Sequence, residues 1–576
     1  MSNSLVSRAA VYVAGALLLV IGAGCARSQA PLADASGEAW DAFVETFITD
    51  YFKHNPLAGV NAGRHEFDGL LPSYHPDSIA AEAVWLQGVR AQAEAFAEES
   101  LDEKRRFERD YLIAVVDGML FWIEEAEWHR RSPAAYSFDP SVYVTRNYAP
   151  LPERMRAYTR HVSGIPEAAG FVKQNLRTPL PRTYVALGRI LFGGLARFLE
   201  NDVPPVFASV TDAGLRAEFD SANAAAVAAL DELDAWFAGL EASATDDYAI
   251  GPELFARMLW TNERVDTPLD ELRRIAEGDL DRNLLEIERA CAQYAPGKSI
   301  PACVQQAEAN KPPEGSLAAA ERQMKELRAF LIDHNIVSIP SEEVAVAKES
   351  PPHMRWNSAF ADLPGPYERD LESIYYISPP DPNWPPQDQQ DYIPGEVNLL
   401  FITVHEVWPG HFLQYLHSNR SESRFGQVFG TYSFVEGWGH YTEEMMWEAG
   451  LSENDPEMHI GQLRNALLRN VRFVTALGLH TGTMTVDEAE TLFREKGFQD
   501  PANARQQAAR GTFDPGFLNY TLGKLMIMKL RDDWTATRGG RAAWREFHDT
   551  FLSYGGPPIP LVRRAMLGST EGSLFR

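Results

Sequence analysis

Four residues between positions 401 and 444 have the types and spacing needed to bind and use a metal ion. His405 and Glu406 are adjacent, His411 follows closely, and Glu436 opens a later run of apolar and aromatic residues. A hydrolytic zinc site takes three ligands from the protein and keeps one position open for water. In the motif HExxH the two histidines bind zinc and the glutamate acts as general base. We therefore interpret His405, His411 and Glu436 as metal ligands and Glu406 as the base.

The spacing of the two histidines departs from that motif, because His411 lies six residues after His405 instead of four. On a regular helix, six residues correspond to a rotation of about 240° and a rise of about 9 Å, so the two rings would point apart. Pro409 and Gly410 lie between them, and both residue types allow a helix to bulge or break. We predict that the helix is interrupted there and that His411 turns back toward His405. Purely structural histidines are the alternative.

Residues near Glu436 could support the metal ligands. Glu436 lies 25 residues after His411, so a helix that carries it can return alongside the first one. His440, four residues later, shares its helical face. Glu443 or Glu444 could accept the outer N–H of a ligating histidine, although either could equally be a solvated surface acid.

The chain that positions these residues divides into three parts by composition. Residues 37–339 place apolar side chains at intervals of three and four, which predicts a region of amphipathic helices. Residues 340–394 contain eleven prolines, so we expect no helix of any length there, and VAVAK and SIYYIS predict short strands in the segment 340–396. Residues 397–576 are again helical in pattern and carry the candidate site. The predicted fold class is therefore mainly α, with a small β element next to the metal site.

The N-terminus predicts export. Residues 1–24 contain the apolar run VYVAGALLLVIGAG and read as a signal peptide, too short to indicate a membrane span. Small residues before Cys25 are typical of a lipoprotein cleavage site, with residues 25–36 as a lipidated tether. Cys291 and Cys303 are the other two cysteines, and in an oxidising compartment they predict one disulfide; two free thiols are the alternative. We expect a periplasmic or outer-membrane-anchored lipoprotein that contacts the membrane through its anchor only.

The charge of the chain excludes one class of partner. The formal net charge is −27, and no run of Lys and Arg interrupts the acidic composition. Nucleic-acid binding depends on clustered cations that release counterions from the phosphates. We therefore expect no nucleic-acid partner.

Several motifs taken together resemble one bacterial family. The motifs, in chain order, are FITVHEVWPGHFLQ, FVEGWGHYTEEMMWEAG, LRNVRFVTALGLHTGTMTVDEAETLF and ARGTFDPGFLNYTLGKLMIMKLR. They look like domain of unknown function 885, whose members are large helical proteins, often secreted or lipid-anchored, that are regarded as zinc peptidases. The HE and GH pairs with a later glutamate are more distantly similar to the thimet-oligopeptidase group, which implies a helical clamshell and a channel for oligopeptides.

The resemblance also implies roles for residues of the C-terminal helices. Similar peptidases place a tyrosine and a histidine opposite the metal to stabilise the oxyanion, and Tyr520 and His480 occupy family motifs that could supply them. Arg510 and Arg472 could bind a substrate carboxylate. Helix packing or structural ion pairs are the alternative for all four. His440 departs from the usual family pattern and could line the site or compete for the metal.

These observations predict a secreted zinc metallopeptidase that hydrolyses short peptides, with Glu406 as general base. Two other functions use the same residues. A metal-dependent amidohydrolase would act on acylated amino acids or peptidoglycan fragments. A non-catalytic metal-binding lipoprotein would need no base, so Glu406 beside His405 counts against it.

Overall fold

The computed structural model describes residues 32–351, 355, 359–368, 370–569 and 572–575. It is 69% helical and 3% strand, so the prediction of a mainly α protein is confirmed. The predicted signal peptide and Cys25 lie outside the described residues. Among the described helices, none is both long and apolar enough to cross a membrane.

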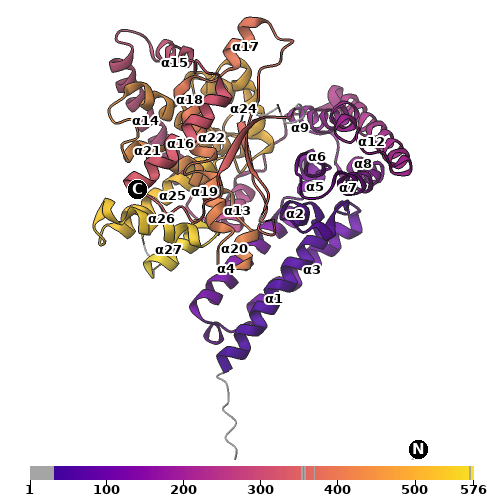
Figure 1. Cartoon of the computed structure of the whole chain (residues 1–576). Coiled ribbons are helices and arrows are strands. Elements are labelled where there is room, and N and C mark those ends of the chain that lie inside the picture. The colour runs from indigo at the N-terminus through magenta and orange to yellow at the C-terminus, as the bar shows by residue number, and fades with distance from the viewer. Residues whose placement is uncertain (1–31, 352–354, 356–358, 369, 570–571, 576) are drawn as a thin grey trace, which may run out of the picture.

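Buried apolar side chains form two clusters that divide the chain near residue 250. Most of those between Trp40 and Phe237 form the first core, and most of those from Ile250 to Phe575 form the second; Phe425 and Leu561 join the first core. Figure 1 shows α7 (Leu151–Ser163), α8 (Ile165–Asn175) and α12 (Ala213–Leu240) of the first core on one side of the molecule. The helices α14 (Leu269–Tyr294), α18 (Glu396–Glu406), α21 (Tyr432–Glu448) and α22 (Pro456–His480) of the second core lie on the other. The helices of the first part are α1 (Leu32–His54), α2 (Pro56–Asn61), α3 (Pro76–Ala95), α4 (Glu103–Leu120), α5 (Trp128–Arg131), α6 (Ser141–Thr145), α7 (Leu151–Ser163), α8 (Ile165–Asn175), α9 (Arg182–Gly188), α10 (Gly194–Asn201), α11 (Val203–Val206) and α12 (Ala213–Leu240).

The predicted boundary at residues 339–340 is not where the two cores separate. Four helices before it pack in the second core together with the C-terminal helices. Apolar periodicity shows that a helix has a buried face but not which core that face joins. The helices of the second part are α13 (Pro252–Glu263), α14 (Leu269–Tyr294), α15 (Ile300–Ala309), α16 (Ser316–His334), α17 (Pro386–Tyr392), α18 (Glu396–Glu406), α19 (His411–Ser418), α20 (Arg424–Val428), α21 (Tyr432–Glu448), α22 (Pro456–His480), α23 (Val486–Glu495), α24 (Pro501–Phe513), α25 (Asn519–Thr535), α26 (Trp544–Ser553) and α27 (Ile559–Leu567).

The proline-rich segment contributes a three-stranded sheet in the order β1–β3–β2. The strands β1 (Ala345–Glu349) and β3 (Ser373–Ile377) are the two predicted ones, and they pair in parallel. The third strand, β2 (Ala359–Asp362), was not predicted, because four residues are too few to show an alternating pattern. It pairs antiparallel with β3, and no other strand of the described residues pairs with its outer edge.

The same segment contains one short helix, which corrects the expectation of none. Helix α17 starts at Pro386, its first residue, and the segment has no further proline before α17 ends at Tyr392. Proline is tolerated in the first turn, because the N–H it lacks would have no partner in the helix there.

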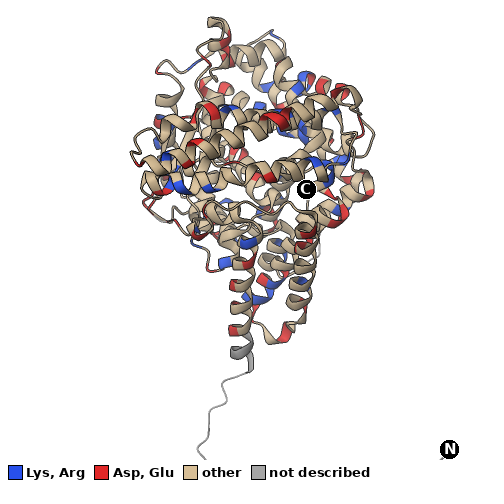
Figure 2. Ribbon diagram, turned by 90° about the vertical axis from the view of Figure 1, so that its right-hand side faces the viewer, with Lys and Arg blue, Asp and Glu red and all other residues tan. Residues whose placement is uncertain are grey.

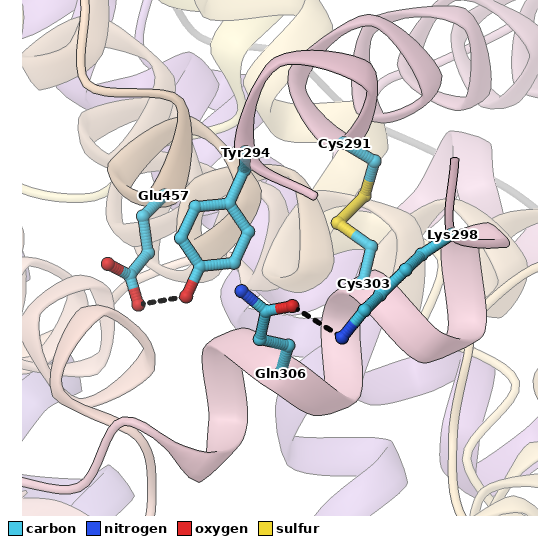
Figure 3. The surroundings of a disulfide bond; sticks show 6 residues. All are labelled: Cys291, Tyr294, Lys298, Cys303, Gln306 and Glu457. Atoms are coloured by element: carbon cyan, nitrogen blue, oxygen red, sulfur yellow. Dashed lines mark hydrogen bonds between the residues drawn. A yellow bond between two sulfur atoms is a disulfide. The ribbon is translucent and has the colours of Figure 1, made fainter. Parts of the chain in front are cut away.

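The predicted disulfide between Cys291 and Cys303 is present. It joins the last turn of α14 to α15 across a short turn, as Figure 3 shows. Near it, the hydroxyl of Tyr294 donates a hydrogen bond of 2.9 Å to Glu457 at the start of α22. Together these contacts hold α14 and α15 against α22, the helix that carries several residues of the candidate site.

Candidate metal centre

The helix that carries His405 is interrupted, as predicted. Helix α18 ends at Glu406 and α19 begins at His411. Between them Val407 leaves helical geometry, the Trp408–Pro409 bond is cis, and the indole of Trp438 on α21 donates a 2.9 Å hydrogen bond to the carbonyl of Pro409. This turn lets α19 start in a new direction beside α21.

Two glycines make room for the histidines. A Cβ on Gly410 would lie 1.7 Å from the carbonyl oxygen of His405, so no larger residue fits at this turn. A Cβ on Gly439 of α21 would lie 2.7 Å from Cε1 of His405. The imidazole of His405 therefore lies directly against the backbone of α21, the helix that carries Glu436.

The three predicted ligands converge. One ligand atom from each of His405, His411 and Glu436 lies within 4.8 Å of the other two. Oε2 of Glu436 is 3.2 Å from Nε2 of His405 and 3.4 Å from Nε2 of His411. Burial alone would raise the pKa of Glu436, but hydrogen bonds to both histidines outweigh it and hold the pKa well below its ordinary value. The carboxylate is therefore charged and placed to share a cation with both rings.

A carboxylate fixes the outer nitrogen of His405. Nδ1 lies 2.8 Å from Oε1 of Glu443, which is fully buried, so Glu443 fills the role that the sequence left open between it and Glu444. Arg469 of α22 approaches the same Glu443 oxygen at 3.1 Å. Burial alone would raise the pKa of Glu443, but the nearby Arg469 and His405 hold it well below its ordinary value, so the carboxylate stays charged.

Sequence reasoning missed Arg469. Its signal was its position one turn before Arg472 on the same helix, which places both guanidinium groups on one face.

Glu444 belongs to a different network. Its carboxylate pairs with Lys524 of α25 at 3.0 Å and with Arg282 of α14 at 2.7 Å. Asp279 of α14 also lies 2.9 Å from Lys524. These four side chains tie α14, α21 and α25 together behind the site.

His440 does not line the cavity, which corrects one expectation. It is fully buried, and its Nδ1 lies 3.4 Å from Oε2 of Glu443. Burial lowers the pKa of His440 to about 4, so its ring is neutral near pH 7. Because Glu443 lies between His440 and His405, His440 holds the Glu443 carboxylate and is not part of the group of candidate ligands.

Glu406 faces the cavity beside the free edge of the sheet. The backbone N–H of Ala361 in β2 donates a 3.2 Å hydrogen bond to Oε2 of Glu406. The small β element therefore lies next to the candidate site, as predicted. The bond also orients the carboxylate, and it comes from a strand whose outward edge has no strand partner among the described residues.

The cavity in front of these residues has a volume of about 510 Å³. All of its lining residues come from positions 359–520, so the second core and the sheet form it. The lining residues are Ala359, Phe360, Ala361, Leu363, Asn398, Ile402, His405, Glu406, His411, Tyr415, Val435, Glu436, Arg464, Asn465, Leu468, Arg469, Arg472, Gln499, Asn503, Arg510 and Tyr520.

Tyr520 lies in the cavity and His480 does not. The ring of Tyr520 stacks on that of His405 with 6.3 Å between centroids. His480 is fully buried, its Nε2 lies 2.8 Å from the carbonyl oxygen of Gly511, and its ring stacks on Phe255. The predicted oxyanion role is therefore wrong for His480, which fills a packing position at the end of α22.

The two predicted carboxylate-binding arginines both reach the cavity. Arg510 is already paired, at 2.9 Å, with Asp514 one turn along α24, and it donates a 3.1 Å hydrogen bond to Tyr432. Arg472 forms no ion pair with any residue that the structure describes. Its Nε donates a 2.9 Å hydrogen bond to Gln507, and its guanidinium carbon lies 4.8 Å from the ring centre of Tyr520.

Comparison with known proteins places the chain in one family. Residues 56–566 match the family described as bacterial protein of unknown function, DUF885, and the chain belongs to it. No curated protein matches.

Two solved structures share the fold. One, from Shewanella oneidensis, is described as a candidate lipoprotein of unknown function; it is 22% identical, covers 92% of this chain and 99% of its own, and has a TM-score of 0.75. A candidate lipoprotein from Colwellia psychrerythraea is 17% identical, covers 93% of this chain and 98% of its own, and has a TM-score of 0.73. These matches do not show the more distant similarity to the thimet-oligopeptidase group.

Proposed function

We propose that this protein is an exported zinc-dependent peptidase that hydrolyses short peptides. The observation that carries the proposal is the convergence of His405, His411 and Glu436 in a cavity that Glu406 also faces. Two histidines and one carboxylate are the donor set of many catalytic zinc sites, and they leave a coordination position open. In the sequence the two histidines are six residues apart, a spacing that a regular helix could not use. The interruption between α18 and α19 brings both rings close enough to bind one ion.

The surroundings of the ligands fit zinc. Glu443 is placed to accept the Nδ1–H of His405, which leaves Nε2 free to face the ion, the usual arrangement behind a ligating histidine. Both ligand rings approach Glu436 through Nε2. The carboxylate of Glu443, which holds Nδ1 of His405, is itself paired with Arg469. Glu443 therefore orients the ring without leaving an unpaired buried charge.

Zinc bound there would supply a Lewis acid that polarises a carbonyl group and lowers the pKa of water. Glu406 would accept one proton from water as the hydroxyl adds to the scissile carbonyl carbon. It would then donate that proton to the amine nitrogen as the C–N bond breaks. Ala361 holds the carboxylate through one oxygen, and the other oxygen remains available for the proton.

Two further features support the proposal: the first suits amide hydrolysis in general, and the second favours a peptide over another amide. The Tyr520 hydroxyl belongs to a ring stacked beside His405, where it can donate a hydrogen bond to developing negative charge. Residues Ala359 to Ala361 of the edge strand line the cavity. An extended peptide can pair with such an edge through its main chain, so the backbone would lie across the ligands.

Export and lipid anchoring are part of the proposal. Cys25 follows a signal-like segment, and both structural neighbours are described as candidate lipoproteins. The disulfide between Cys291 and Cys303 agrees with an oxidising compartment.

Metal analysis of the purified mature protein tests the site. We expect about one zinc per chain in the parent protein and strong loss in His405→Ala and in the isosteric Glu436→Gln. His459→Ala is the matched control, because His459 stacks on Trp447 and does not line the cavity, and it should keep its zinc. Equal metal content in the parent protein and both ligand variants would refute the ligand assignment.

Hydrolysis of a peptide panel tests the activity. Glu406→Gln should retain zinc and lose about 10²–10⁴-fold in rate, the usual contribution of a general base. A panel of acylated amino acids, run beside the peptides, separates a peptidase from an amidohydrolase. Zinc binding without hydrolysis of any peptide would contradict the proposed function.

A further inference from the structure

The cavity is basic although the chain is strongly acidic. The formal charge of the whole chain is −27, and Figure 2 shows Asp and Glu residues on helices throughout the molecule. The cavity lining nevertheless contains four arginines and only two carboxylates. The four are Arg464, Arg469, Arg472 and Arg510. Such a concentration of cations at the wall of a cavity attracts an anionic ligand.

Three of the four arginines already have a carboxylate partner. Arg464 pairs with Glu308, Arg469 with Glu443 and Arg510 with Asp514. These pairs neutralise their charges inside the protein. They leave Arg472 as the lining arginine whose charge is not matched by a described acid.

Arg472 is only 7% exposed, yet neither of its terminal nitrogens forms a hydrogen bond with a described residue. Burial and the positive charges of Arg510 and Arg469 lower the pKa of Arg472 to about 10, so it stays charged near pH 7. The face of Tyr520 compensates part of the charge through a cation–π contact at 4.8 Å. A buried guanidinium with two free nitrogens is matched to a carboxylate, which it binds through two parallel hydrogen bonds.

Arg472 lies one aromatic ring away from the candidate metal ligands. Its guanidinium carbon is 4.8 Å from the centre of Tyr520, and that ring is 6.3 Å from the ring of His405. Together these distances limit the separation between the guanidinium carbon of Arg472 and the ring centre of His405 to about 11 Å. Roughly three residues of extended chain span that distance. One short peptide can therefore place its carboxylate at Arg472 and one of its peptide bonds at the candidate metal ligands.

We propose that Arg472 binds the free C-terminal carboxylate of the substrate, so that this protein removes short fragments from the C-termini of peptides. The inference rests on the proposed function for the cleavage step, because it uses the same ligands and base. Water adds its hydroxyl to the scissile carbonyl and its proton to the leaving nitrogen. The released C-terminal fragment keeps the carboxylate that Arg472 holds.

Peptide binding tests the carboxylate site without turnover. In the Glu406→Gln background, calorimetry compares a peptide with a free C-terminal carboxylate and the same peptide with a C-terminal amide. We expect the free acid to bind about 10–100-fold more tightly, as a charged hydrogen-bonded pair predicts. Arg472→Met should abolish the difference, and Arg472→Lys should restore part of it.

Arg464→Met is the matched control, because its guanidinium lines the same cavity but is paired with Glu308. It should retain the preference for the free acid. Equal binding of acid and amide by the parent background, no binding of either, or an unchanged preference in Arg472→Met would overturn the carboxylate site.

Mass spectrometry of the products tests the cleavage position. The parent protein should release fragments of one to three residues from the C-termini of free-acid peptides and cleave their amides poorly. Cleavage at internal bonds with equal rates for acid and amide would overturn the exopeptidase mode. If the free acid binds through Arg472 but no peptide is hydrolysed, the carboxylate site stands and the proposed function fails.

Discussion

At the scale of single residues, the site depends on a chain of contacts that runs outward from His405. Its ring is held by the backbone of α21 at Gly439, its outer nitrogen by Glu443, and Glu443 by Arg469. Each contact fixes the next one. The direction in which Nε2 points is thus determined by residues that would not touch the metal.

Glu443→Gln is expected to weaken zinc binding about 10–100-fold, the usual effect of losing a carboxylate behind a ligating histidine. The amide keeps the shape of the side chain but removes the charge that favours an Nδ1–H. Competition with a chromophoric chelator measures the affinity. Glu448→Gln on the same helix is the control, because Glu448 pairs with Arg531 away from the site. An unchanged affinity in Glu443→Gln would contradict the role given to Glu443.

At the scale of elements, two helices cross closely enough to set the geometry of the site. Gly437 of α21 meets Gly523 of α25, and a Cβ on Gly523 would lie 2.0 Å from the carbonyl oxygen of Ser433. This contact places Tyr520, three residues before Gly523, next to Glu436, one residue before Gly437. Two small residues thus bring the ligand helix and the tyrosine helix together.

A buried acid joins α13 to the first turn of α21. Glu263 accepts hydrogen bonds from the backbone N–H and the hydroxyl of Ser433, and burial raises its pKa to about 7. Between about pH 4.5 and pH 7, Glu263 is therefore protonated in the folded protein but ionised in the unfolded chain. Stability contributed by this proton is present at low pH and is lost as the pH rises through about 7.

The difference in unfolding free energy between the parent protein and Glu263→Gln should therefore change by about 2.5 kcal/mol between pH 5 and pH 8, in favour of the variant at high pH. Urea titrations of both proteins at several pH values measure it. Glu253→Gln, at an exposed position of the same helix, should follow the parent protein at every pH. A pH-independent difference would contradict the buried, protonated state of Glu263.

At the scale of the whole molecule, the candidate site belongs entirely to the second core. Its candidate ligands come from α18, α19 and α21, and nearly all of the buried apolar side chains of these helices join that core. A bound metal would therefore stabilise the second core against unfolding and have little effect on the first.

Removal of zinc by a chelator should lower the thermal midpoint of the parent protein, and added zinc should restore it. A ligand at a thousandfold excess over its dissociation constant stabilises the native state by about 4 kcal/mol. Differential scanning calorimetry checks the shift, with His459→Ala as a control that responds like the parent protein. A shift of equal size in His405→Ala would place the metal elsewhere.

The residue types of the site, the helical class of the fold and a disulfide between Cys291 and Cys303 could all be predicted from the sequence. Helical periodicity, strand composition and cysteine count are local signals, so they can be read without knowing which elements meet. The sequence could also indicate that the Pro409–Gly410 pair would break the helix. It could not show that Trp438 and Gly439 of α21 would pack against Pro409 and His405 at the interruption.

The pairing of the charged side chains could be read only from the folded protein. His480 and Tyr520 both lie in family motifs, yet one is packed against Phe255 and the other lines the cavity. Arg510 and Arg472 look equivalent in sequence, yet a carboxylate four residues away neutralises the first and no described acid neutralises the second. Pairing depends on contacts between helices that are far apart in the chain, and single-sequence patterns do not specify those contacts.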